Sequence, residues 1–297
     1  MAQRLFRFGV VAAQARSGEE WSEKARRIEA LGFATIVVPD GLRYTLAPLP
    51  ALAVAAAATR TLRVGTYVIA NDFRNPVLLA KEAATLDLLS GGRFELGIGA
   101  GRPGAAEDNR MLGIPFDSGG VRLARLAESI AIVKSLLGGG AATATGDHYR
   151  VADAEVAPRP VQQPHPPILV AGSGRRMLEL AAREADIVAL GVEPGETEAG
   201  VATKIGWLRE AAGDRFDNLE INLNLLAVGG AVPRYVAANM DVTALRRAGA
   251  VTVLTGTVEE MSDRLMALRE TLGISYVMVS DELMEAFAPV VARLAGR

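Results

Sequence analysis

The hydrophobic pattern of the chain alternates between short, almost continuous apolar runs and longer stretches in which apolar residues recur every three or four positions. The short runs are typical of strands buried on both faces of a parallel sheet, and the longer stretches are typical of helices. Glycine or proline marks many of the boundaries between the two kinds of segment. The predicted strands are 7–13, 34–40, 62–70, 93–99, 166–172, 185–191, 219–229 and 274–280.

A helical stretch follows each predicted strand, so the chain consists of eight predicted βα units. Eight such units favour an α/β fold of the (β/α)8 TIM-barrel type, in a single domain over residues 1–297. A doubly wound parallel sheet is the alternative. Two longer connections predict insertions, one after the fourth strand at 100–119 and one before the fifth strand at 138–165.

The helix predicted at 48–59 is apolar on nearly all sides. The outer helices of a barrel normally expose one face to water, so a helix without a polar face indicates a covered surface. We expect a homodimer whose subunits meet through this helix. The alternative is that the chain's own loops cover it.

Composition narrows the possible functions. The 297 residues carry a formal net charge of −2, which argues against nucleic acid as the main partner. The chain has no cysteine and only two histidines, so disulfides and thiolate ligands are excluded and no metal site is predicted. The first apolar run is too short for a signal peptide, and no run of about 20 apolar residues follows. We therefore expect a cytoplasmic protein without a membrane partner.

In a barrel the reactive residues lie at the carboxyl ends of the strands. Here these ends are rich in glycine and offer one early carboxylate, Asp40, with no nucleophile–base pair and no pair of facing carboxylates. The fourth strand, within "SGGRFELGIGAG", carries glycine at positions that indicate the close approach of a backbone or a ligand. Such a site suits a cofactor that supplies its own chemistry to a small-molecule substrate.

The stretch "VAGSGRRM" places glycines between the fifth strand and the start of a helix. The free N–H groups of a helix N-terminus, reached through glycines, form a cradle for phosphate. Arg175 and Arg176 stand in the first turn, where cations oppose the helix dipole and an anionic ligand would explain them. The alternative is that both arginines point into solvent.

Several motifs in their order along the chain resemble the bacterial-luciferase-like flavin and deazaflavin oxidoreductases. They are "VPD", "VGTYVIANDFRNPVLLAKEAATLDLLSGGR", "SGGRFELGIGAG", "PPILVAGSG" and "LGISYVMV", and they extend over residues 6–280. Within that superfamily the sequence is most similar to the subgroup that uses the deazaflavin coenzyme F420. The resemblance implies a TIM barrel with the cofactor ring in the barrel mouth.

The resemblance also implies which residues bind the cofactor. A non-prolyl cis peptide between Tyr67 and Val68 would support the ring, with a plain trans strand end as the alternative. Ala70 and Asn71 would line the ring edge. The cofactor's phosphate-bearing side chain would lie along Gly99, Ala100, Gly101 and Arg102, and its phosphate would lie at Ala171, Gly172, Ser173, Gly174 and Arg175.

Asp40 matches the acid at the end of the second strand in the deazaflavin branch, which faces the ring near the substrate. We expect it to be the catalytic residue, and the alternative is that it caps or braces the Pro39–Gly41 turn. Arg102 stands where the sugar-phosphate branch of the family has a glutamate that acts in proton transfer. Gly41 replaces the histidine that follows the acid there. This departure argues against sugar-phosphate oxidation and leaves the substrate unidentified.

Three functions remain open. The first is a coenzyme F420-dependent oxidoreductase acting on a small organic molecule. The second is an FMN-dependent monooxygenase that uses reduced flavin and oxygen. The third, from another class, is a non-catalytic protein that binds flavin or deazaflavin.

Overall fold

A computed structural model describes residues 4–43 and 46–297. For each predicted apolar run, the main parallel sheet has a strand that begins within two residues of the start of the run. The strands are β1 Arg7–Val11, β2 Thr35–Val38, β3 Arg63–Thr66, β4 Ile69–Ala70, β5 Phe94–Gly99, β6 Ala142–Thr145, β7 Arg150–Ala154, β8 Ile168–Gly172, β9 Ile187–Leu190, β10 Glu220–Asn224, β11 Ala227–Val228, β12 Val253–Leu254 and β13 Ile274–Ser280.

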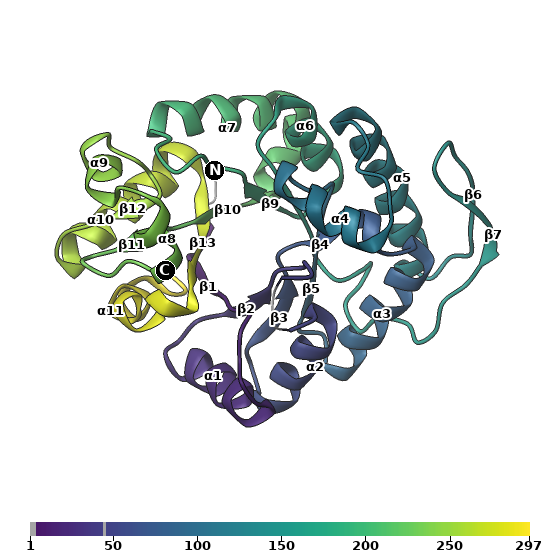
Figure 1. Ribbon diagram of the computed structural model, residues 1–297, viewed down its shortest axis with the longest axis horizontal. Coiled ribbons are helices and arrows are strands. Elements are labelled where there is room, and N and C mark those ends of the chain that lie inside the picture. The colour runs from purple at the N-terminus through teal and green to yellow at the C-terminus, as the bar shows by residue number, and fades with distance from the viewer. Residues whose placement is uncertain (1–3, 44–45) are drawn as a thin grey trace. The chain divides into compact units, whose positions relative to one another are not determined.

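Helices follow the strands along the chain (Figure 1). Several begin or end at the residues that the sequence marks, for example at Pro76 and before Gly273. The helices are α1 Gly18–Ala30, α2 Pro48–Ala58, α3 Pro76–Leu89, α4 Ala106–Leu112, α5 Gly119–Leu137, α6 Arg175–Glu184, α7 Glu198–Ala212, α8 Arg234–Asn239, α9 Val242–Arg247, α10 Val258–Leu272 and α11 Met284–Leu294, with 3-10 turns η1 Asn71–Phe73, η2 Pro103–Ala105, η3 Gly213–Asn218 and η4 Asp281–Leu283.

The main sheet is closed. Its strand order is β3-β2-β1-β13-β10-β9-β8-β5-β4, and β3 also pairs with β5, which joins the two ends of the order. The strand predicted at 62–70 is divided into β3 and β4, so the sheet corresponds to the eight predicted βα units. The TIM-barrel prediction is therefore confirmed, and the doubly wound alternative is wrong because an open sheet has no such closing pair.

The chain divides into two compact units. The first comprises residues 1–12, 24–37 and 171–297, and the second comprises residues 13–23 and 38–170. In the first unit β1 pairs in parallel with both β2 and β13, and Phe8 packs edge-on against Phe287 of α11 with ring centroids 5.4 Å apart. This aromatic pair fixes the last helix against the first strand.

The second unit contains both predicted insertions. The segment after β5 forms η2 and α4, and the segment before β8 forms the antiparallel hairpin β6–β7, which projects beyond α5 (Figure 1). Glu128 of α5 holds the tip of this hairpin, because its carboxylate accepts the backbone N–H groups of Asp147, His148 and Tyr149 at 3.1 Å. The hairpin is thereby fixed to the unit.

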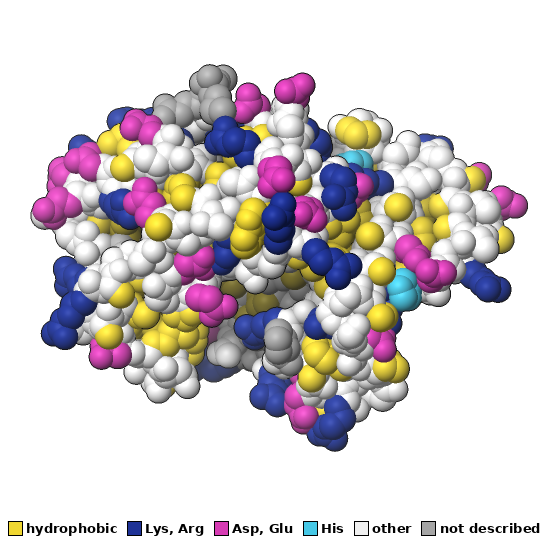
Figure 2. All heavy atoms as spheres, turned by 90° about the horizontal axis from the view of Figure 1, so that it is seen from above, with side chains coloured by type: hydrophobic (Ala, Val, Ile, Leu, Met, Phe, Trp, Pro, Cys, Tyr) yellow, Lys and Arg dark blue, Asp and Glu magenta, His cyan; other side chains and the backbone are white. Residues whose placement is uncertain are grey.

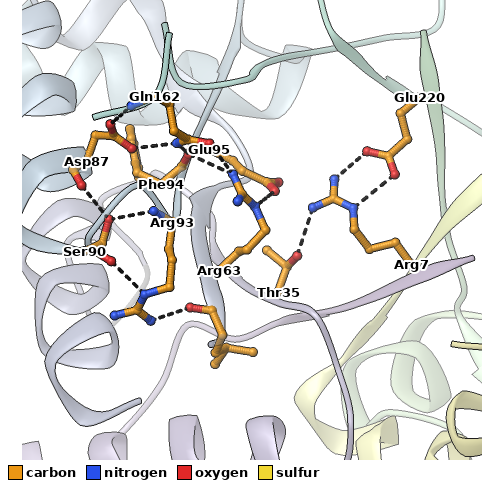
Figure 3. Close-up of polar contacts among 11 residues, drawn as sticks. Arg7, Thr35, Arg63, Asp87, Ser90, Arg93, Phe94, Glu95, Gln162 and Glu220 are labelled. Atoms are coloured by element: carbon orange, nitrogen blue, oxygen red, sulfur yellow. Dashed lines mark hydrogen bonds and ion pairs between the residues drawn. The ribbon is translucent and has the colours of Figure 1, made fainter. Parts of the chain in front are cut away.

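Arginine–carboxylate clusters lie at the beginnings of the strands (Figure 3). In the first unit Arg7 pairs with Glu220 at 2.5 Å and donates to Thr35 at 3.3 Å. In the second unit Arg63 pairs with Glu95 at 2.5 Å and donates to Gln162 at 2.8 Å. The amino ends of barrel strands serve stability rather than chemistry, so these clusters are structural.

Helix α2 buries Ala51, Leu52, Ala55 and Ala56 and leaves Val54 43% exposed. Helix α3 packs beside it and exposes Leu78. An apolar exposed strip therefore remains on α2, as its sequence predicts, and the homodimer stays a prediction.

Among the described residues no helix is long and apolar enough to cross a membrane. On the face drawn in Figure 2, basic and acidic side chains are interspersed rather than gathered by sign.

Candidate functional site

The carboxyl ends of β2 and β4 meet through Asp40. Its Oδ2 accepts the backbone N–H of Ala70 at 3.0 Å and pairs with Arg74 Nη1 at 2.5 Å. The Asp40 side chain is only 7% exposed. The carboxylate therefore fixes the end of β4 and the Arg74 guanidinium, rather than the Pro39–Gly41 turn, and its catalytic role stays a prediction.

The peptide bond between Tyr67 and Val68 is cis, as the family resemblance implies, and that prediction is confirmed. It lies between β3 and β4. The backbone N–H of Tyr67 donates to the carbonyl of Val38 at 2.9 Å, which aligns it with the end of β2. Burial raises the pKa of the Tyr67 phenol, so this group stays protonated.

Gly97 and Gly99 of β5 lie against residues 66–68, which lead from the end of β3 to β4. A Cβ on Gly97 would lie 2.0 Å from the carbonyl oxygen of Thr66, and a Cβ on Gly99 would lie 2.8 Å from Cγ2 of Val68. Ala70 pairs with Gly99 in register. The close approach that the sequence indicates is therefore made by the backbone and side chain of residues 66–68, which itself accounts for both glycines.

The loop after β5 is fixed by an arginine that the sequence analysis did not single out. Arg122 of α5 donates through Nη1 to the carbonyl of Ala100 at 2.6 Å and to that of Gly101, and its guanidinium stacks on Phe116 at 4.1 Å. Gly101 has a φ of +78°, a conformation that favours glycine. Arg102, in contrast, is exposed.

Asn71, at the start of η1, is 1% exposed. Its Nδ2 donates to the hydroxyl oxygen of Tyr149 at 3.2 Å, while its Oδ1 is buried without a hydrogen-bond partner in the described part of the chain. Burial raises the pKa of Tyr149. An unpaired buried acceptor is costly unless a ligand satisfies it, so Asn71 is a candidate ligand contact.

An open cavity of about 360 Å³ lies next to this pair. It is lined by η1 and the two residues after it, by the loop before α5, by Arg125 and by the hairpin tip. Arg125 pairs with Asp72 at 2.9 Å and with Asp117. Burial acts to lower the pKa of Arg125, but hydrogen bonds and attraction from Asp117 and Asp72 outweigh it and raise the pKa. The guanidinium is therefore a permanent, neutralised cation.

In the first unit, the turn from β8 to α6 carries the second group of predicted site residues. Ala171 and Gly172 are half-buried, whereas Ser173, Gly174 and Arg175 are exposed. No side chain of the described residues caps the helix at Gly174, and a Cβ there would meet none of their atoms within 4 Å. The first N–H groups of α6 are thus open to an anionic ligand.

The two arginines of this turn, Arg175 and Arg176, differ in whether they form ion pairs within the protein. Arg175 pairs with Glu179 at 3.0 Å and with Glu210 at 3.1 Å, so an anionic ligand is not needed to explain it. Arg176 is exposed and makes no ion pair with any described residue. The cation argument from sequence therefore applies to Arg176 rather than to Arg175.

The turn is supported by β9. The N–H of Gly191 donates to the carbonyl of Gly172 at 2.8 Å, and a Cβ on Gly191 would lie 2.9 Å from that of Ser173. Lys204 of α7 donates to the Gly191 carbonyl at 2.7 Å and pairs with Glu196 at 2.5 Å. Lys204 had no sequence signal, because a lysine in an amphipathic helix ordinarily lies in solvent.

Within residues 4–43 and 46–297, no three His, Cys, Asp or Glu side chains are grouped so that they could hold a metal ion. The predicted site residues fall into two groups: the ends of β2, β4 and β5 in the second unit, and the β8–α6 turn in the first. Sequence patterns missed Arg74, Arg122 and Arg125, whose roles depend on partners distant in sequence.

Comparisons with known proteins relate the chain to a family and to individual relatives. The family model described as luciferase-like monooxygenase matches residues 5–239. An F420-dependent glucose-6-phosphate dehydrogenase of Beutenbergia cavernae is 35% identical over 166 residues, which are 53% of this chain and 48% of that protein. The oxygenase component of the flavin-dependent trigonelline monooxygenase of Acinetobacter baylyi is 34% identical over 142 residues, 47% of this chain and 38% of that protein.

The chain thus spans about half or less of the length of these two curated relatives. Among solved structures, the coenzyme F420-dependent tetrahydromethanopterin reductase of Methanopyrus kandleri superposes with a TM-score of 0.79. It is 18% identical, and the match covers 98% of this chain and all of that one. At this identity the likeness shows the fold alone.

Proposed function

The chain belongs to the luciferase-like monooxygenase family, and from that premise we propose that it is an oxidoreductase that transfers hydride between coenzyme F420 and a small organic substrate. The name of the Beutenbergia relative supports the choice of cofactor. The observation that carries the proposal is the uncapped N-terminus of α6, whose open N–H groups suit a phosphate-bearing cofactor.

The residues present fit a deazaflavin. The buried Oδ1 of Asn71 has no hydrogen-bond partner among residues 4–43 and 46–297, and it is suited to accept an N–H from the ring edge. Val68, Ala70 and Gly99 would adjoin the ring, and Ala100, Gly101 and Arg102 would follow its side chain. The phosphate would lie at Ser173 and Gly174, beside Arg176. When bound, the coenzyme supplies the hydride chemistry that the protein side chains lack.

The chain's own side chains hold in place the backbone segments that would bind the cofactor. Asp40 holds the Ala70 amide and Arg74, so we propose that it acts by positioning the end of β4. Arg122 keeps the carbonyls of Ala100 and Gly101 fixed, which preserves the path for the cofactor side chain. Gly191 holds the β8–α6 turn through its hydrogen bond to Gly172, and Lys204 in turn holds the Gly191 carbonyl. Rigid support of this kind is what precise cofactor placement requires.

Fluorescence titration of the purified protein with coenzyme F420 and with FMN tests the proposal. We expect saturable binding of F420, followed by hydride transfer to at least one member of a broad acceptor panel. Tight binding of FMN with no response to F420 would overturn the proposal in favour of the monooxygenase. Binding of F420 without transfer to any acceptor would favour a non-catalytic binding protein.

Asp40→Asn tests the positioning role. The amide keeps one acceptor for Ala70 but removes the charge that pairs with Arg74, so we expect F420 affinity to fall about tenfold, as loss of a charge-assisted hydrogen bond predicts. Asp263→Asn, at an exposed site on α10, is the matched control and should bind normally. Unchanged affinity in Asp40→Asn would contradict the role.

We also propose a homodimer formed through α2, supported by the exposed Val54 and by Leu78 on the adjacent α3. Val54→Lys should yield monomers in light scattering after size exclusion, because a buried ammonium is costly at an apolar interface. Val161→Lys, at a comparably exposed valine outside α2, should leave the mass unchanged.

A further inference from the structure

The cavity of about 360 Å³ beside the β6–β7 hairpin has a definite chemical character. Its apolar walls include Phe73, Ile114 and Pro115. Its volume lies in the range of small-molecule sites. None of the residues predicted from sequence to bind the cofactor lines it, so it is a separate candidate for binding the substrate.

The charged groups of the cavity are already paired. Arg125 is held between Asp72 and Asp117, and both terminal nitrogens of Arg74 face Asp40, at 2.5 and 3.5 Å. A phosphorylated or carboxylated ligand needs guanidinium groups whose donors are available. Because these donors are directed at carboxylates, the cavity favours an uncharged ligand.

Two polar groups remain for a ligand. Tyr149 accepts the amide hydrogen of Asn71, which leaves its own hydroxyl proton without an acceptor among the described residues. His148 contributes its imidazole to the same wall, and its ring makes no hydrogen bond within the described part of the chain. Glu128 fixes both residues by holding their backbone N–H groups.

We propose that this cavity binds an uncharged organic molecule through a carbonyl oxygen, with the Tyr149 hydroxyl as the hydrogen-bond donor. The proposal names the substrate class of the oxidoreductase and to that extent rests on the proposed function. A carbonyl oxygen accepts but cannot donate, which matches the one proton that Tyr149 has to offer. The raised pKa of Tyr149 keeps that proton in place at neutral pH.

The experiment uses the coenzyme-free protein with cyclohexanone labelled with ¹³C at the carbonyl. The infrared carbonyl stretch reports the hydrogen bond directly, and titration gives the affinity. We expect the carbonyl stretching frequency of the bound ketone to be lower in the wild-type protein than in Tyr149→Phe. In Tyr149→Phe the shift should disappear and the affinity should fall about tenfold, as loss of one well-placed hydrogen bond predicts.

Tyr235→Phe is the matched control, since Tyr235 lies on α8, is 49% exposed and does not line the cavity. It should retain both the shift and the affinity. Circular dichroism of all three proteins establishes that each is folded. If Tyr149→Phe does not fold, a photoreactive ketone, a benzophenone, replaces the variant: labelling of Tyr149 or His148 supports the proposal, and labelling elsewhere alone overturns it.

Equal affinity and an equal frequency shift in wild type and Tyr149→Phe would overturn the proposal. Failure of the wild-type protein to bind cyclohexanone would overturn it too, as would displacement of the bound cyclohexanone by glucose 6-phosphate. F420 titration of the same proteins separates this proposal from the proposed function. Tyr149-dependent ketone binding without F420 binding would reject the function alone. F420-dependent turnover with unchanged ketone binding in Tyr149→Phe would reject the cavity assignment alone.

Discussion

Two glycine-rich stretches look alike in the sequence and differ in the structure. In β5, Gly97 and Gly99 leave room for residues 66–68 of the neighbouring chain segment. In the β8–α6 turn, Gly172 leaves room for Met177, whereas Gly174 faces open space. Gly97, Gly99 and Gly172 therefore make room for the protein's own backbone or side chains, whereas Gly174 leaves room for solvent or a ligand. Substitution by alanine separates these two uses.

The largest effect is expected for Gly97→Ala. The new Cβ would lie 2.0 Å from the Thr66 carbonyl oxygen, and Thr66 is also bonded to Gly97 through its hydroxyl at 2.7 and 2.8 Å. Because backbone must move, we expect the free energy of unfolding to fall by about 3 kcal/mol or more. Chemical denaturation measures it.

Gly206→Ala is the control for this substitution, since Gly206 lies within α7 and a Cβ there meets nothing. It should raise stability by about 0.5–1 kcal/mol. If Gly97→Ala unfolds at the wild-type denaturant concentration, the packing explanation of the β5 glycines is wrong.

A smaller effect is expected for Gly99→Ala, because the Cβ would contact a side-chain atom, Cγ2 of Val68, at 2.8 Å. We expect a loss of about 1–2 kcal/mol. The double variant Val68→Ala with Gly99→Ala should be more stable than the sum of the two single changes predicts, because the contact is then absent. Strict additivity of the three unfolding energies would show that the contact does not matter.

The smallest change in stability is expected for Gly174→Ala, within about 0.5 kcal/mol, since the position is open and its φ is −80°. The same substitution should weaken F420 binding several-fold, because a methyl group would crowd a phosphate at the start of α6. Arg176→Ala should weaken binding by a similar factor, and Arg175→Ala should weaken it less. Equal effects of the two arginine variants would contradict the distinction drawn from their ion pairs.

Sequence reasoning succeeded where the signal is local. The strand at 34–40 was predicted because a continuous apolar run does not depend on distant partners, and β2 lies within that run. The family motifs also predicted the cis bond at Tyr67–Val68. In contrast, α4 was not predicted, because its seven residues lie in a polar segment without a clear apolar face.

The site shows the same division. Asp40 and the β8–α6 turn were predicted as site residues from strand ends and glycine spacing, and Asn71 was predicted from the family resemblance. The pairings that define their chemistry were not predicted: Asp40 pairs with Arg74, 34 positions away, and Asn71 pairs with Tyr149, 78 positions away. A single sequence carries no pairing information over such separations.

The sequence by itself determined the eight βα units of the barrel, the family and the glycine positions, because these follow from local pattern and motif. Only the tertiary structure decided what each group faces. It paired Asp40 with Arg74, placed Thr66 against Gly97, left Gly174 open and brought the Tyr149 hydroxyl to Asn71. The physical reason is that the role of a polar group or a glycine depends on what fills the space around it, and folding brings that from distant parts of the chain.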